Sequence, residues 1–288
     1  MKAMNALIIR NLRLFFRDRS AVFFSLLAVF IIIGMYVLFL GDVMTQGMTQ
    51  IPGARFLMDS WIMAGLLAVT SATTTLGAFG IMVEDRSSGT DRDFNASPVS
   101  REALAGAYLI STFLIGLAIS LVTLALCEAY ILLKGGSLLP LTAFWKVLGL
   151  ILLTTLASSA MVAFLVSFFR SNKAFSSFST VVGTLIGFLT GIYIPIGNLP
   201  ESVQLVIKAF PIAHGAALFR QVFMEVPLEA SFAGATPEMV RDFEALLGIR
   251  FQQGSTFLSP QTHLLVLGAS SLLFFLLAAW RFRQRRRN

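Results

Sequence analysis

The chain has 288 residues, of which 56% are hydrophobic and 13% are charged, and its formal net charge is +7. A soluble domain of this length has too little interior to bury so much apolar surface, so the composition excludes a soluble globular fold. The sequence has no GxxxxGK(S/T) phosphate-binding loop and no GxSxG nucleophile elbow. We therefore expect a membrane protein that is not an enzyme, with any energy source on another chain.

Six apolar stretches are long enough to cross a bilayer, which takes about 20 predominantly apolar residues per helix. They cover roughly residues 21–40, 60–83, 104–133, 144–169, 175–197 and 262–280. We predict an all-α polytopic membrane protein in which residues 1–288 form a single transmembrane domain. The first stretch is too long for a signal peptide and no small-residue cleavage site follows it, so we expect it to be retained.

Positive charge is distributed unevenly along the chain. When the N-terminus is assigned to the cytoplasm, most of the 22 Lys and Arg residues flank the spans on the cytoplasmic side. This asymmetry predicts that both termini are cytoplasmic. The basic charge is then a topology signal and an attraction to anionic membrane lipids, and we expect no nucleic-acid partner.

Residues 1–19 predict an amphipathic helix lying flat at the cytoplasmic surface. One side of this helix carries Ile8, Leu12, Phe15 and Phe16, and the other carries Arg10, Arg13 and Arg17. The alternative interpretation is a basic flank that only sets orientation.

Two extramembrane segments stand out. The cytoplasmic loop 84–103 is densely charged, Gly89 permits a turn in it, and Ser97 before Pro98 predicts a helix start. Segment 198–261 is the only large outer piece. Its first half is broken by prolines and predicts short helices dipping into the outer leaflet, whereas Thr236, Pro237 and Gly248 bracket a soluble helix.

Several polar residues within the spans are candidate functional groups. Hydroxyl residues gather in the second span and, mixed with aromatic residues, in the fifth, so they suit either close helix packing or a cavity for amphiphiles. Glu128 is either a functional carboxylate or a group that reaches the interface or pairs with Lys134. His214 and His263 are far apart in sequence without ligand-type neighbours, so we expect no metal site. The single cysteine, Cys127, excludes a disulfide within the chain.

Two groups of motifs resemble type-2 ABC transporter permeases. The stretch from Glu84 to Thr90 reads Glu-Asp-Arg-Ser-Ser-Gly-Thr, and Pro-Val-Ser-Arg follows at 98–101, as in the inner loop of that family. After the fifth span, a similar series of family positions is matched by Gly191, Pro195, Leu199, Pro200, Phe210, Pro211, His214 and Arg220. Many relatives have Leu-Glu after the Gly-Thr, whereas this chain has Asp91 and Arg92.

The resemblance implies a drug, antibiotic or lipid exporter in the plasma membrane of a bacterium. Two copies of the chain, as a homodimer, would pair with two ATP-binding subunits that hold the ATP and Mg. The inner loop would form a coupling helix docked on the ATPase, with Glu84, Arg86, Gly89, Thr90, Pro98, Ser100 and Arg101, braced by the N-terminal helix. A cavity at the dimer axis would be lined by Thr70, Thr73, Thr74, Phe178, Thr180, Thr184 and Phe188. Its outer gate would contain Pro195, Leu199, Pro200 and Pro211.

Three alternatives remain open at this point. A secondary transporter driven by an ion gradient would need mid-membrane carboxylates or an inverted repeat, and neither is evident. A membrane enzyme acting on lipid would need polar catalytic groups that the spans lack. ABC export of a polysaccharide would favour more polar and aromatic platforms facing the pore.

Overall fold

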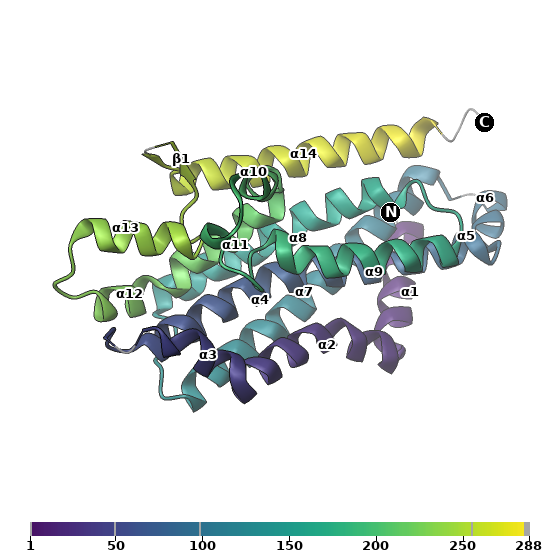
Figure 1. The fold of residues 1–288 in the computed structure, drawn as a ribbon. Coiled ribbons are helices and arrows are strands. Elements are labelled where there is room, and N and C mark those ends of the chain that lie inside the picture. Colours follow the sequence, from purple (N-terminus) through teal and green to yellow (C-terminus); the bar gives the residue numbers. More distant parts are fainter. Residues whose placement is uncertain (1, 49, 98, 255, 285–288) are drawn as a thin grey trace.

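The computed structural model describes residues 2–48, 50–97, 99–254 and 256–284 as a bundle of helices (Figure 1). Pro98 and the arginines at 285–287 lie outside the described residues. The helices in chain order are α1 Lys2–Arg17, α2 Arg19–Met35, a π-helical turn Tyr36–Leu40, α3 Gly41–Gln46, α4 Ala54–Ala78, α5 Gly80–Ser87, α6 Thr90–Ala96, α7 Arg101–Leu133, α8 Leu141–Val166, α9 Asn172–Leu189, a 3-10 turn Ile196–Asn198, α10 Glu201–Ala209, α11 Pro211–Phe223, α12 Glu225–Ser231, α13 Pro237–Leu246 and α14 Pro260–Gln284. Two short strands, β1 Gln252–Gln253 and β2 Thr256–Phe257, form an antiparallel hairpin that was not expected from the sequence.

Five helical stretches among the described residues are long and apolar enough to cross a membrane. They are Arg19–Gln46, Ala54–Ser87, Arg101–Leu133, Leu141–Val166 and Pro260–Gln284. A sixth crossing is reached only if α10 and α11, which meet at 92°, count as one broken span. The all-α polytopic architecture is therefore confirmed, with five to six spans.

Two predicted boundaries are wrong. The outer loop predicted at 41–59 is mostly helical, because the first span continues to Gln46 and α4 already begins at Ala54. The fifth predicted span, 175–197, is not among these five stretches, and its helix α9 ends early at Leu189. Its helix stops there because Gly191 takes a left-handed φ of 67° and Pro195 follows within about one turn.

Helix α4 forms the centre of the bundle, and α7, α8 and α11 pack around it. Almost every residue of α4 is buried, and small residues permit the close approach of its neighbours. On α7, a Cβ added at Gly116 would lie 2.8 Å from the methyl groups of Thr75 and Thr155, so only glycine fits between the three helices. Helix α14 packs along α8, whereas α9 contacts mainly α4 and α5 and leaves most of its surface exposed.

The segment between α9 and α14 folds over one end of the bundle. Thr236 caps α13 by accepting a hydrogen bond from the Met239 amide at 3.4 Å, and Pro237 occupies the first helical position, as predicted. Gly248 follows the helix with a φ of 63°. The Trp61 ring nitrogen donates to the Leu247 carbonyl at 2.8 Å, which ties this cap to α4.

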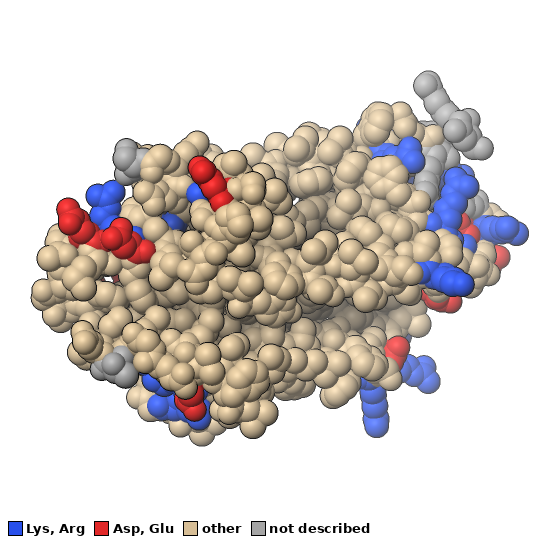
Figure 2. Space-filling model, in the orientation of Figure 1, with Lys and Arg blue, Asp and Glu red and all other residues tan. Residues whose placement is uncertain are grey.

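Charged side chains gather toward the two ends of the molecule and leave a broad, largely uncharged middle on the face that Figure 2 shows. One end carries α1, α5, α6 and the last turns of α14, together with both chain ends, and we call it the α6 end (Figure 1). The opposite end carries α12, α13 and the β hairpin, and we call it the α13 end. This separation is the pattern expected when the apolar middle lies in lipid.

Candidate functional site

The polypeptide turns twice at the α6 end before it re-enters the bundle. Helix α4 passes directly into α5 through Phe79, and α5 ends before Gly89, whose φ of 83° is left-handed. The seven-residue helix α6 follows at once, and the chain is extended again at Ser97. A short helix therefore projects beyond the bundle between two long apolar helices.

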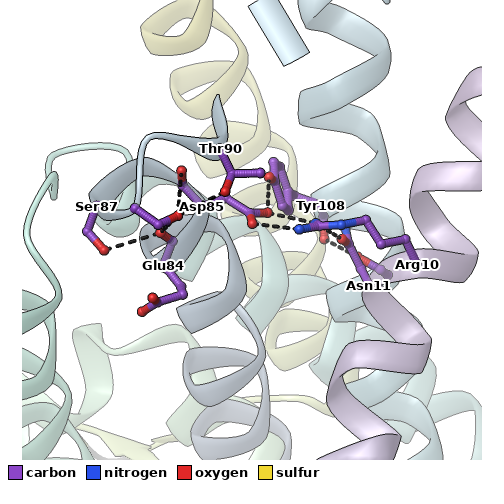
Figure 3. Close-up of polar contacts among 9 residues, drawn as sticks. Arg10, Asn11, Glu84, Asp85, Ser87, Thr90 and Tyr108 are labelled. Carbon is purple, nitrogen blue, oxygen red and sulfur yellow. Dashed lines mark hydrogen bonds and ion pairs between the residues drawn. The ribbon is translucent and has the colours of Figure 1, made fainter. Parts of the chain in front are cut away.

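A buried carboxylate anchors this turn to two other helices (Figure 3). Asp85 of α5 accepts hydrogen bonds from both terminal nitrogens of Arg10 on α1, at 2.7 and 2.8 Å, and from the Tyr108 hydroxyl of α7, at 2.6 Å. The Asp85 side chain is 7% exposed and that of Arg10 is 31% exposed. Hydrogen bonding to the Asp85 carboxylate raises the pKa of Arg10 above its ordinary value.

A second polar contact extends the same cluster. Asn11 is buried, accepts a hydrogen bond from Arg10 at 3.1 Å and donates one to the Ser111 hydroxyl of α7 at 3.1 Å. Leu7 and Phe15 lie one turn on either side of Asn11 and are also buried. The buried face of α1 is therefore Leu7, Asn11 and Phe15, which shares only Phe15 with the predicted apolar face.

The other side of α5 contacts the connection between α8 and α9. Arg86 donates to the carbonyls of Val166 and Phe169, at 3.3 and 3.2 Å. The Glu84 carboxylate accepts a hydrogen bond from the side chain of Asn172, the first residue of α9. Helix α5 is thus joined by polar contacts to α1, α7, the α8–α9 turn and α9.

The structure brings most of the predicted coupling residues together at this end. Glu84 and Arg86 lie on α5, Gly89 makes the turn, and Thr90 begins α6, where its hydroxyl lies 3.0 Å from that of Ser88. The predicted helix start at Ser97 is wrong. Helix α7 begins at Arg101 instead, because Ser100 is its cap and accepts from the Ala103 amide at 3.2 Å.

The remaining residues predicted for the N-terminal helix do not join the cluster. Arg13, Phe16 and Arg17 are exposed on α1, and only Arg10 turns toward α5. Exposed Ile9 and Leu14 lie on the same helix as Phe16. An exposed surface that mixes basic and apolar side chains suits the headgroup region of a membrane, and the surface position of α1 stays a prediction.

The predicted cavity residues do not line one cavity within the single chain. Thr70 and Thr74 are buried in α4, where neighbouring Ser71 lies 3.3 Å from Ser158 of α8. On α9, Phe178 is partly buried and packs on Phe169, whereas Thr180, Thr184 and Phe188 are exposed. Thr73 is partly buried and bonds to the carbonyl of Val69.

A buried arginine holds the turn that precedes the predicted gate residues. Pro195, Leu199 and Pro200 flank the 3-10 turn after α9, and Pro211 begins α11. Arg220 of α11 is 0% exposed and donates to the carbonyls of Thr190 and Gly191, at 2.9 and 3.0 Å. Its guanidinium lies 4.8 Å from the centre of the Trp61 ring. Arg220 therefore caps the last turn of α9 and holds the turn that begins the gate.

Two further groups have partners that the sequence did not indicate. His214 and His263 are in direct contact, with their Nδ1 atoms 2.9 Å apart, although 49 positions separate them. No group of three metal-ligating side chains occurs among the described residues. Glu128 accepts a hydrogen bond from the Leu139 amide at 3.0 Å and so holds the loop that follows α7. The sequence had suggested Lys134 as one possible partner of Glu128.

Asp85, the centre of the site, was not predicted from the sequence. It stands between the motif residues Glu84 and Arg86, and the motif alone does not distinguish the buried member of the acidic pair. A helical projection carried on from the second span would have pointed to it, because Asp85 follows Ala78 by seven positions and Met82 by three, and both are buried on the same helix face.

Long apolar helices, charge at both ends and a structured helical turn between two spans define a multi-pass α-helical membrane protein. The model of the ABC-2 family transporter protein matches residues 53–280, and the chain belongs to this family. No curated protein matches the chain. Family membership makes the chain a transmembrane permease subunit and not an ATPase, and it implies partnership with an ABC ATP-binding subunit.

Proposed function

We propose that this chain is the permease subunit of an ATP-driven exporter that moves a hydrophobic or amphiphilic compound, such as a drug, an antibiotic or a lipid, out of the cell. The observation that carries this proposal is the Asp85 cluster. Asp85 joins α5, the helix from which α6 projects, to α1 and α7, and neighbouring Glu84 joins α5 to the start of α9. A force applied to α6 from outside the bundle is thereby transmitted to several spans together.

In this proposal α6 docks in a groove of an ATP-binding subunit, and the α6 end faces the cytoplasm. The clustering of arginines at the α6 end supports that orientation, since cytoplasmic flanks of membrane spans are enriched in Lys and Arg. Two copies of the chain then pair with two ATP-binding subunits, which hold ATP and Mg. Closure of the ATPase pair pushes α6, and alternating access follows.

The exposed face of α9 supports pairing of two identical chains. Val181, Leu185 and Phe188 expose 58%, 48% and 44% of their surface along one helix. Thr180 and Thr184 lie on the same helix and bond back to their own backbone, so their methyl groups are available for packing. A second copy set against this face would enclose the exposed Thr180, Thr184 and Phe188 between the two chains.

An uncharged translocation path favours a hydrophobic or amphiphilic cargo. The hydroxyl residues of α4 and α9 offer hydrogen bonds without charge, and exposed aromatic rings such as Phe188 offer apolar contacts. Export of a polysaccharide is the runner-up, since it would use the same architecture with more polar platforms.

Reconstitution with its ATP-binding subunit tests the proposal. Vesicles containing both proteins are expected to accumulate a fluorescent amphiphile when ATP is present on the α6 side. Vesicles whose ATPase carries a substitution at its catalytic glutamate should not. Uptake that follows an imposed proton or sodium gradient without ATP would contradict the proposal and favour an ion-driven transporter.

A further inference from the structure

A basic cavity opens at the α6 end, beside the turn that carries α6. We call it the cup. It has a volume of about 720 Å³. Among the described residues, its charged lining has five arginines and one carboxylate, namely Arg86, Arg92, Arg101, Arg170, Arg281 and Asp91. Such an excess of guanidinium groups around one cavity favours an anionic occupant, and guanidinium binds phosphate oxygens in pairs.

A second cavity of about 690 Å³ continues from the cup, and we call it the furrow. The two cavities share Arg101, Ala105 and Phe282 in their walls. The furrow runs between α7 and α14, and Ala163 of α8 lines it where these two helices stand apart. Its lining extends from Arg101 to Leu109 on α7, which is about 12 Å of helix at a rise of about 1.5 Å per residue.

Apart from its mouth, the furrow is lined by apolar and small residues, among them Gly106, Leu109, Phe275, Ala278 and Ala279. The spans on both sides of it present exposed apolar side chains beyond it, including Leu114 on α7 and Leu272 on α14. The furrow therefore opens toward the surface that lies against lipid. At its mouth Arg283 lies 3.5 Å from Glu102, so the transition from apolar wall to charged rim is abrupt.

Arg281 is the member of the cup with the most distinctive environment. Its guanidinium lies 4.8 Å from the centre of the Phe168 ring, so it is held in place by an aromatic face. Its Nε atom is buried and has no hydrogen-bond partner among the described residues. A buried donor without an acceptor is costly, and an anion in the cup removes that cost.

We propose that the cup and the furrow together bind one phospholipid with an anionic head group. The phosphate lies among the arginines of the cup, and one acyl chain lies in the furrow between α7 and α14. The furrow favours a lipid over a free anion or a protein surface as the occupant. Neither of those would use an apolar furrow about 12 Å long within the apolar layer. Arg86 and Arg101 belong to both the cup and the coupling segment, so the bound lipid stiffens the turn that carries α6.

The test uses the full chain in nanodiscs and brominated lipids, which quench tryptophan fluorescence at contact. Trp280 follows furrow residue Ala279, Trp61 is buried in the core, and Trp145 lies at the start of α8. In a Trp145→Phe background, Trp280 is therefore the tryptophan that reports on lipid near the furrow. Brominated phosphatidylglycerol is expected to quench Trp280 at a much lower fraction of the bilayer than brominated phosphatidylcholine does.

Charge and shape variants separate the site from general surface attraction. The Arg170→Gln/Arg281→Gln double variant is expected to lower the preference for phosphatidylglycerol about 25-fold, since each arginine near the surface contributes roughly five-fold. The matched variant Arg13→Gln/Arg17→Gln removes equal charge from exposed positions of α1 and should keep the preference. Ala279→Leu narrows the furrow without changing charge and should also weaken quenching.

Four outcomes would overturn the proposal. Equal quenching by the two lipids removes the anionic preference, and an equal loss in the α1 control variant assigns it to the surface as a whole. Protection of the chain against thermal unfolding by glycerol phosphate alone, lost in the Arg170/Arg281 variant, makes the cup a free-anion site. Unchanged lipid quenching in that variant, with loss of the copurifying ATP-binding subunit, assigns the cup to a protein interface.

Discussion

Asp85 binds Arg10 through both of its carboxylate oxygens, at 2.7 and 2.8 Å, across 75 positions of sequence. This contact joins the helix before the first span to the helix that follows the second. In the proposed exporter, both helices lie next to the ATP-binding subunit. The pair therefore sets the orientation of the segment that receives force.

A double-mutant cycle measures this contact. Asp85→Asn and Arg10→Gln are each expected to lower the free energy of unfolding by about 1 to 3 kcal/mol, because each leaves a partly buried partner unpaired. The double variant should lose less than the sum of the two, since it leaves no unpaired charge. Additive losses in denaturation of the purified chain would show that the two residues do not act as a pair. Arg13→Gln, exposed on the same helix, should change little.

Gly89 sets the angle between α5 and α6 through its φ of 83°. Gly89→Ala is expected to cost about 1 kcal/mol or to shift α6, because residues with a Cβ avoid left-handed backbone. No atom lies within 4 Å of the added methyl, so the backbone alone causes the effect. The amount of ATP-binding subunit that copurifies with the Gly89→Ala variant should therefore be lower than with the unmodified chain.

Gly77→Ala provides the matched control for that experiment. A methyl group added at Gly77 also has no atom within 4 Å, but this glycine lies inside α4 with ordinary helical backbone. The Gly77→Ala variant should retain the ATP-binding subunit fully. Equal losses in the two variants would mean that the left-handed turn has no special role.

Arg220 is expected to be more important for the gate than for stability. Arg220→Met replaces a buried cation by an apolar side chain of similar length, and such exchanges are often neutral or stabilising. The thermal unfolding temperature should therefore stay the same or rise. Hydrogen exchange across residues 188–196 should accelerate, because the carbonyls of Thr190 and Gly191 lose their donor. Unchanged exchange there would contradict the assigned clamp.

Glu244 makes the stability of α13 depend on pH. Burial raises the pKa of the Glu244 carboxyl above its ordinary value of 4.5, and Arg250 and Arg241 only partly oppose this. The folded chain then holds this proton more tightly than the unfolded chain does. The contribution of Glu244 to the stability of the folded chain is fully present below about pH 4.5, and it is lost as the pH rises through the higher pKa of the folded state.

Hydrogen exchange of α13, corrected for the intrinsic pH dependence, measures this effect. Protection should decline as pH rises from 4.5. Glu244→Gln should abolish the decline, whereas Glu238→Gln, at an exposed position of the same helix, should leave it in place. Protection that increases over this range would contradict the assignment.

The sequence predicted the features that follow from local composition. Long apolar stretches, the Thr236 cap of α13 and the turn at Gly89 all depend on neighbouring residues, and the structure confirms them. The end of the fifth span was misplaced because an apolar stretch continues past Leu189, although the backbone breaks at Gly191.

The features that the sequence did not predict depend on contacts between distant segments. The Asp85 cluster joins residues from three helices, and the His214–His263 contact joins α11 to α14. Arg220 looked like an outer-loop cation, yet it is buried because α11 folds back into the bundle against Trp61. Such contacts depend on how distant helices pack together, and the local sequence around either residue does not show this.

Cysteine crosslinking tests the central claim most directly, because the native Cys127 is fully buried and does not compete with an introduced thiol for reagent. Asp93→Cys on exposed α6 is expected to crosslink to the ATP-binding subunit and to react with an impermeant thiol reagent only in inverted vesicles. Glu238→Cys on α13 should react in intact cells and not crosslink. Labelling of position 93 from outside the cell, or crosslinking of position 238 to the ATPase, would contradict the account.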